Sequence, residues 1–139
     1  MNKINMFLFP WLVSIVATLG SLYFSEIMEF VPCTLCWYQR ILMYPLSVLF
    51  AFGFFTRDRN LFKYTYPLIL IGNVLSFYHF GMQKLGFGAS MPVCSQGVSC
   101  AGFYINWFGF ITIPLLSFVA FSLLHIYFWI QFINNKKRS

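Results

Sequence analysis

The sequence predicts an all-α integral membrane protein, a bundle of four transmembrane helices with both termini in the cytoplasm. Hydrophobic residues make up 60% of the 139-residue chain and charged residues only 9%, against about 25% charged in an ordinary soluble domain. A small soluble domain leaves too much chain exposed to hide so much apolar surface, and disorder requires low hydrophobicity. Four apolar stretches are long enough to span a bilayer. Most basic residues lie near the two termini and between the second and third stretches, which places them on one side of the membrane.

The four predicted spans are residues 6–25, 37–55, 64–83 and 107–133, and residues 1–139 are expected to form a single membrane domain. The runs are continuously apolar and do not alternate as barrel strands do. The second span contains one charge, Arg40, and the others contain none. Each span contains one proline, which membrane helices tolerate because neighbouring groups re-satisfy the backbone; the prolines are Pro10, Pro45, Pro67 and Pro114.

The distribution of basic residues predicts the orientation. Positive residues stay in the cytoplasm, so the outer loops are residues 26–36 and 84–106. This topology, together with contact between the basic residues and lipid, explains the net charge of +6, so the charge does not indicate binding to nucleic acid. The first span is longer than the apolar core of a signal peptide and lacks a clear cleavage site. We therefore expect it to stay in the protein as a transmembrane helix. The cytoplasmic basic residues are Lys3, Arg57, Arg59, Lys63, Lys136, Lys137 and Arg138.

All four cysteines fall in the predicted outer loops, where disulfides persist. Cys33 and Cys36 form a C-x-x-C motif, and Cys94 and Cys100 form a C-x5-C motif. Four cysteines allow three pairings, among which sequence alone does not choose. A C-x-x-C is a redox dithiol or half of a zinc site, and the five-residue spacing of the second pair is outside the usual zinc range. A redox dithiol is favoured, with two structural disulfides as the alternative.

The residues around the C-x-x-C motif favour redox chemistry. With Pro32 as the first residue of the second helix, Cys33 and Cys36 lie in its first turn, where the helix dipole stabilises a thiolate. Arg40 lies four residues after Cys36 and therefore on the same face. A charge inside a span is a functional candidate, although Arg40 lies close enough to the span's edge to snorkel to the interface.

His79 is a second polar candidate, near the outer end of the third span at roughly the depth of Cys36 and Arg40. Gln83 lies one turn further out on the same face. A membrane histidine also serves simply as a hydrogen-bonding group between helices. His125 belongs to the cytoplasmic half of the fourth span and is expected to be structural.

Three segments together resemble the DsbB family of disulfide bond formation proteins, including the BdbC proteins of Gram-positive bacteria. They are Cys33-Thr34-Leu35-Cys36-Trp37-Tyr38-Gln39-Arg40, then His79-Phe80-Gly81-Met82-Gln83 followed by Pro92 and Cys94, and Trp107-Phe108-Gly109 through Pro114. The related vitamin-K-epoxide-reductase proteins carry their C-x-x-C in the last helix, whereas here it comes first.

The resemblance implies a protein-dithiol:quinone oxidoreductase of the bacterial cell membrane with its cysteines facing outward. Cys94 would accept a mixed disulfide from an extracytoplasmic thioredoxin-fold oxidase of the DsbA or BdbD type. Cys100 would exchange with Cys33, and the resting pairs would be Cys33–Cys36 and Cys94–Cys100. The Cys36 thiolate would pass electrons to menaquinone or ubiquinone at a site with Arg40, His79 and Gln83, without a metal. The competing interpretations are a non-enzymatic four-span subunit with two structural disulfides and a small transporter.

Overall fold

The computed structural model describes residues 5–29, 31, 33–86 and 113–138. Within these ranges the chain is helical and contains no strand, which confirms the all-α class. Its elements are α1 (Asn5–Leu22), the short π-helical segment η1 (Tyr23–Ile27), α2 (Thr34–Thr56), α3 (Leu61–Leu85) and α5 (Ile113–Arg138).

Among the described residues, three helical segments are long and apolar enough to cross a membrane: Met6–Ile27, Thr34–Thr56 and Ile113–Arg138. The fourth helix, α3, has 25 residues, about 37 Å of helix, so it also has the required length. It is less apolar because it carries polar groups such as Asn73, His79 and Gln83. The structure therefore supports a helical membrane protein with three clear candidate spans and a fourth helix of spanning length.

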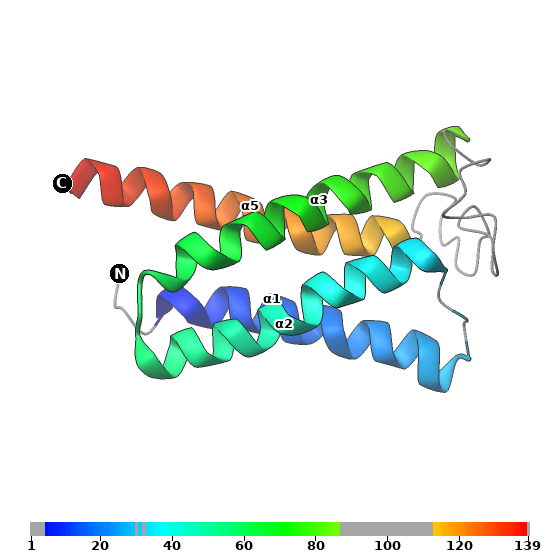
Figure 1. The fold of residues 1–139 in the computed structure, drawn as a ribbon, viewed down its shortest axis with the longest axis horizontal. Coiled ribbons are helices and arrows are strands. Elements are labelled where there is room, and N and C mark those ends of the chain that lie inside the picture. Colours follow the sequence, from blue (N-terminus) through cyan, green and yellow to red (C-terminus); the bar gives the residue numbers. More distant parts are fainter. Residues whose placement is uncertain (1–4, 30, 32, 87–112, 139) are drawn as a thin grey trace.

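The helices pass up and down between two ends of the molecule (Figure 1). One end contains the start of α1, the α2–α3 connection and the end of α5. The opposite end contains the α1–α2 connection, the end of α3 and the start of α5. Left-handed backbone terminates two helices: Arg57 (φ 57°) after α2 and Gly86 (φ 72°) after α3. The chain reverses between α2 and α3, so the end of α3 lies at the same end of the bundle as the start of α2.

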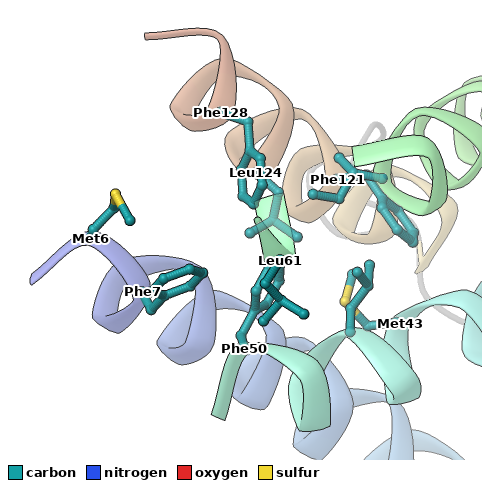
Figure 2. Packing of buried hydrophobic residues seen from close by; sticks show 10 residues of the cluster. Met6, Phe7, Met43, Phe50, Leu61, Phe121, Leu124 and Phe128 are labelled. Atoms are coloured by element: carbon teal, nitrogen blue, oxygen red, sulfur yellow. The ribbon is translucent and has the colours of Figure 1, made fainter. Parts of the chain in front are cut away.

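Apolar side chains from all four helices fill the core, with phenylalanine rings from α1, α2 and α5 and with Leu61 and Ile69 from α3 (Figure 2). The ring centroids of Phe7 and Phe62 lie 4.6 Å apart, and those of Phe62 and Phe128 lie 4.5 Å apart. Many large apolar side chains instead cover the outer surface, with Val16, Val48 and Phe55 all more than two-thirds exposed. An apolar surface of this extent is typical of a face that contacts lipid.

Two glycines let neighbouring helices approach closely. A Cβ at Gly72 in α3 would collide with the ring of Phe121 from α5. A Cβ at Gly53 in α2 would lie 2.7 Å from Leu61 Cδ2 and 2.9 Å from the ring of Phe7. Small residues at such contacts are a common device of membrane helix packing. They fix α3 against α5 and α2 against α1, and so set the relative positions of the polar residues nearer the other end.

Candidate redox site

The C-x-x-C motif lies at the start of α2. Cys33 is the N-cap residue with extended backbone (φ −74°, ψ 173°), and Cys36 is in the first turn. The Cys33 carbonyl accepts a 3.1 Å hydrogen bond from the Trp37 amide. The helix begins at Thr34, so the expectation that Cys33 lies inside the first turn is wrong: a capping residue needs extended backbone, and Cys33 has it. Both sulfurs still lie at the positive end of the helix dipole.

The two cysteines are free thiols in the described state. Their Sγ atoms are 3.4 Å apart, which is a sulfur hydrogen bond rather than a disulfide of about 2.05 Å. Cys33 is buried and Cys36 partly buried, packed with Leu35, Met82 and Tyr78. The structure therefore presents the reduced form of the pair, with the two sulfurs already adjacent for bond formation.

His79 of α3 extends the hydrogen bonding of this pair. Its Nε2 lies 3.7 Å from Cys33 Sγ, and its Nδ1 lies 3.2 Å from Gln39 Nε2. His79 is 1% exposed and Gln39 6% exposed. Because an amide nitrogen donates, Nδ1 accepts from Gln39, which leaves the proton on Nε2 pointing to the sulfur. Gln39 thus selects the histidine tautomer that donates a hydrogen bond to Cys33.

These contacts lower the pKa of the Cys33 thiol from 9.0 to about 4. The largest cause is the hydrogen bond from Cys36, with a smaller contribution from His79, while burial acts in the opposite direction. In the reduced pair the negative charge therefore lies on Cys33 and the proton on Cys36. A thiolate is the form that attacks disulfides, so this charge distribution favours Cys33 over Cys36 as a nucleophile in the reduced pair.

Arg40 lies one turn below Cys36 and contacts α1. Its Nη2 donates a 3.0 Å hydrogen bond to the Ser21 carbonyl, and its guanidinium carbon lies 5.4 Å from the centre of the Trp37 ring. The acceptor lies two residues before the short π-helical segment η1, a distortion frequent at functional sites. Arg40 is therefore held by a protein acceptor inside the bundle, which a residue that simply snorkels to the interface would not require.

A pocket of about 610 Å³ begins at these residues and runs between α1 and α5. Cys33, Cys36, Arg40, His79 and Gln83 all line it. The rest of the wall is mostly apolar and follows α1 from Phe9 to Gly20 and α5 from Ile113 to Leu123. A mostly apolar cavity with a few convergent polar groups is the usual form of a small-molecule site.

The same site also has three side chains that could bind a metal ion. Each offers one ligand atom, and these atoms lie within 4.8 Å of one another: the sulfurs of Cys33 and Cys36 and a ring nitrogen of His79. A structural zinc site has four protein ligands, and within the described ranges no fourth Cys, His, Asp or Glu joins the group. Disulfide formation and metal binding require the same two sulfurs, so the two activities would compete.

The structure brings together five of the seven predicted site residues around one pocket. Cys94 and Cys100 lie outside the described residues. Sequence reasoning missed three polar groups: Gln39, the Ser21 carbonyl and Tyr44, which lies four residues after Arg40 and lines the pocket. Gln39 had a usable signal, because it is a polar residue near the start of an apolar span, like Arg40. The contact between the Ser21 carbonyl and Arg40 depends on how α1 packs against α2, and no sequence signal predicts it.

A buried pair of thiols lies next to a histidine at one end of a helical membrane bundle. This arrangement is that of a membrane thiol–disulfide oxidoreductase site.

Comparison with known proteins supports the same class of protein. Residues 3–131 match the family model of disulfide bond formation protein DsbB. Disulfide bond formation protein C of Bacillus subtilis is 50% identical over 127 residues, 91% of each chain. A probable disulfide formation protein C of Halalkalibacterium halodurans is 51% identical over 123 residues, 88% of this chain and 89% of the relative.

The similarity extends to a prophage-derived protein. The SPbeta prophage-derived disulfide bond formation protein B of Bacillus subtilis is 40% identical over 121 residues, 86% of this chain and 80% of that protein. No solved structure matches significantly. The chain belongs to the DsbB family of disulfide bond formation proteins, as the residues around the C-x-x-C indicated.

Proposed function

We propose that the protein is a dithiol:quinone oxidoreductase that reoxidises an extracytoplasmic thioredoxin-fold thiol oxidase and so sustains disulfide formation in exported proteins. The observation that carries this proposal is the position of the Cys33–Cys36 pair. The pair lies at the polar end of an apolar pocket between membrane helices, where a lipid-soluble electron acceptor can reach it. An acceptor of this kind explains why the redox pair is built into a membrane bundle.

The proposed topology has four spans in a single membrane domain, with α3 as the fourth span and both termini in the cytoplasm. Support comes from the charges at one end of the bundle, where Arg57, Arg59 and Lys63 adjoin the α2–α3 connection and Lys136, Lys137 and Arg138 end α5. Under the positive-inside rule that end is cytoplasmic. Cys33 and Cys36, at the opposite end, then face the oxidising side of the bacterial cell membrane.

This topology has a direct test. In a variant whose four cysteines are replaced by serine, a single cysteine introduced as Met28→Cys should react with a membrane-impermeant maleimide on intact cells. A single cysteine introduced as Asn60→Cys should react only after the cells are opened. The reverse pattern would overturn the orientation.

The partner half of the reaction is assigned to Cys94 and Cys100. Their disulfide would oxidise the partner's two thiols through a mixed disulfide at Cys94. Cys100 would then exchange with Cys33 of the Cys33–Cys36 disulfide and release Cys36 as a thiolate. When the Cys33 sulfur is bonded to Cys100 in a disulfide, it carries no negative charge. The repulsion that favours a protonated Cys36 in the fully reduced pair is then absent. The assignment of Cys36 as the electron donor therefore agrees with Cys33 being the thiolate of the fully reduced pair.

The residues of the pocket fit a quinone. The apolar length between α1 and α5 suits an isoprenoid tail, and the polar end offers donors for a ring oxygen. The quinone, menaquinone or ubiquinone, would accept the two electrons and two protons released when two thiols become one disulfide. Arg40 would stabilise the developing negative charge on the ring oxygen, while His79 would lie beside the ring and Gln83 would complete the polar end.

The proposal is tested by anaerobic turnover. Purified protein is mixed with a reduced thioredoxin-fold oxidase and a soluble quinone, and the quinone absorbance is followed together with the thiol content. Two thiols should disappear for each quinone reduced, and Cys94→Ser should abolish this turnover. Folded protein that reduces no quinone with several partners and quinones would instead favour a non-enzymatic membrane subunit with structural disulfides.

A further inference from the structure

The reduced Cys33–Cys36 pair and His79 bring three metal-binding atoms to one place. The two sulfurs are 3.4 Å apart, and His79 Nε2 lies 3.7 Å from Cys33 Sγ. The spacing of Cys94 and Cys100 argues against a zinc site built from two cysteine pairs. The structure supplies a different third ligand, an imidazole from the end of α3, which no spacing along the chain reveals.

The distances between these atoms resemble the edges of a zinc coordination polyhedron. With bonds of about 2.3 Å to sulfur and about 2.05 Å to nitrogen, two sulfurs on one tetrahedral Zn²⁺ lie about 3.8 Å apart, and a sulfur and a nitrogen about 3.6 Å apart. The observed separations of 3.4 Å and 3.7 Å are close to these values. All three ligand atoms lie within 4.8 Å of one another, so the edge between Cys36 and His79 needs to shorten by about 1.2 Å at most. The site is nearly preformed for a tetrahedral ion.

The surroundings of the three ligands also suit zinc. Cys33, Cys36 and His79 all line the pocket, and a zinc ion with three protein ligands takes water or another small ligand in its fourth position. Two thiolates, a neutral imidazole and Zn²⁺ carry no net charge, which reduces the cost of placing the ion in mostly apolar surroundings. Mg²⁺ and Ca²⁺ prefer oxygen ligands, so this donor set selects a thiophilic ion.

Gln39 provides the contact that a metal-bound histidine needs. A histidine bound to metal through one ring nitrogen usually donates its other N–H to a nearby acceptor. Gln39 Nε2 lies 3.2 Å from His79 Nδ1. The glutamine amide carries both a donor group and an acceptor oxygen. By turning its amide, Gln39 accepts from Nδ1–H when Nε2 binds the metal, whereas it donates to Nδ1 in the metal-free site.

We propose that Cys33, Cys36 and His79 form a Zn²⁺ site that exists only while the cysteine pair is reduced, and that the bound ion blocks reoxidation of the pair. The sulfurs of a disulfide are about 2.05 Å apart and offer no thiolate to a metal. Zn²⁺ keeps its oxidation state; it displaces the thiol proton of the pair to solvent, and the imidazole proton occupies Nδ1. This inference goes beyond the proposed function and requires neither quinone nor partner oxidase.

The site is tested with Co²⁺, a coloured substitute for Zn²⁺. Cys94→Ser/Cys100→Ser protein is reduced under anaerobic conditions, so that Cys33 and Cys36 supply its only thiols. One Co²⁺ should bind per chain with thiolate-to-cobalt absorption and the intense visible bands of a four-coordinate ion, and Zn²⁺ but not Mg²⁺ should displace it. The disulfide form should bind none. Absence of these bands in the reduced protein, or equal bands in the oxidised protein, would overturn the inference.

A matched pair of histidine variants tests the third ligand. His79→Leu should weaken Co²⁺ binding by about a hundredfold or more, because loss of a partner outside the ligand shell already costs about ten- to hundredfold. His125→Leu is the control: it removes the other histidine of the chain, whose ring stacks with that of Tyr66 on α3 at 5.6 Å and does not line the pocket. The control should bind Co²⁺ as the parent does. Equal affinity of the two variants would contradict the site.

Thermal unfolding without metal shows whether the histidine variants are folded. If His79→Leu does not fold, a second pair decides: Gln39→Glu should bind Co²⁺ more tightly than the parent, and Gln39→Leu about tenfold less tightly. The reverse order, or equal affinities, would overturn the inference.

Protection from alkylation tests the block in the wild-type chain. Saturating Zn²⁺ should protect Cys33 and Cys36 of the reduced protein from iodoacetamide and slow their oxidation by glutathione disulfide, and EDTA should restore both rates. Unchanged rates would overturn the inference. Zn²⁺ binding by protein that reduces no quinone would remove the proposed function alone, and quinone reduction by protein that binds no Zn²⁺ would remove this inference alone.

Discussion

His79 Nε2 lies 3.7 Å from Cys33 Sγ, although 46 residues separate the two in sequence. The contact joins the end of α3 to the N-cap of α2, so the thiolate depends on the packing of two helices and not on the C-x-x-C motif alone. Gln39, from α2, holds the far side of the imidazole. Cys33, Gln39 and His79 therefore form a short chain of hydrogen bonds that begins and ends on the same helix.

The first prediction concerns the pH dependence of Cys33. Since its pKa is lowered from 9.0 to about 4, Cys33 is a thiolate at every pH between these values, where an ordinary thiol is largely protonated. Alkylation of Cys33 by iodoacetamide in the reduced protein should therefore change little from about pH 6 to about pH 8. In His79→Ala the midpoint of the rate profile should move to higher pH, because one hydrogen bond to the thiolate is lost.

Peptide mass spectrometry measures the alkylation of Cys33 separately from the other cysteines. Ser76→Ala is the matched control, since Ser76 is buried on the same helix and its hydroxyl donates to the backbone carbonyls of Gly72 and Asn73. Its profile should follow the wild type. A wild-type profile that rises through pH 9 would contradict the assignment of the charge to Cys33.

A second prediction separates Gln39 from a merely structural residue. Gln39→Leu should move the Cys33 midpoint to higher pH, because the imidazole loses the donor that fixes its tautomer. Gln39→Glu should restore a low midpoint, since a carboxylate accepts from Nδ1–H and favours an imidazolium that donates to the sulfur from Nε2. Equal behaviour of the two variants in the same alkylation assay would show that Gln39 acts only through packing.

Arg40 is the subject of the third prediction. Arg40→Ala should raise the KM for quinone by about tenfold or more, the value of a charge-assisted hydrogen bond. The rate of thiol exchange with the partner oxidase should remain that of the wild type. Steady-state kinetics in quinone and rapid mixing with reduced partner measure the two separately. If quinone kinetics stay unchanged, the role of Arg40 is limited to its hydrogen bond with the Ser21 carbonyl.

Apolar length predicted the helices well, but their ends less well. The predicted span 37–55 is a helix that begins at Thr34, because capping and hydrogen bonding define the start of a helix and hydropathy does not. The predicted span 64–83 extends to Leu61–Leu85, where left-handed Gly86 terminates it. The π-helical turn after α1 has no sequence signal of its own. Of the predicted span 107–133, residues 107–112 lie outside the described part of the chain.

Spacing along one helix predicted part of the site. Residues four apart share a face, which correctly grouped Cys36 with Arg40 and His79 with Gln83, and comparable depth in the membrane placed His79 near the cysteines. Rotation of one helix about its axis relative to another depends on core packing, for which the sequence carries no simple pattern. The sequence therefore did not reveal that His79 contacts Cys33, that Gln39 contacts His79, or that Tyr44 lines the same pocket.

The fourth prediction concerns this packing. Gly72→Ala places a Cβ against the ring of Phe121 and should destabilise the protein by about 1–3 kcal/mol through overpacking. Gly81→Ala is the control on the same helix, since among the described residues a Cβ there meets no atom outside the helix's own backbone within 4 Å, and it should be neutral or slightly stabilising. Thermal unfolding in one detergent compares the two. Equal melting temperatures would contradict the close α3–α5 contact.

The central claim is that electrons leave the protein from the Cys33–Cys36 pair. Its most direct test is a single turnover, in which fully reduced protein is mixed anaerobically with one equivalent of soluble quinone, quenched in acid and alkylated for disulfide mapping. One Cys33–Cys36 disulfide should form for each quinone reduced, and Cys36→Ser should reduce none. Quinone reduction that leaves Cys33 and Cys36 as free thiols, or that persists in Cys36→Ser, would contradict the account.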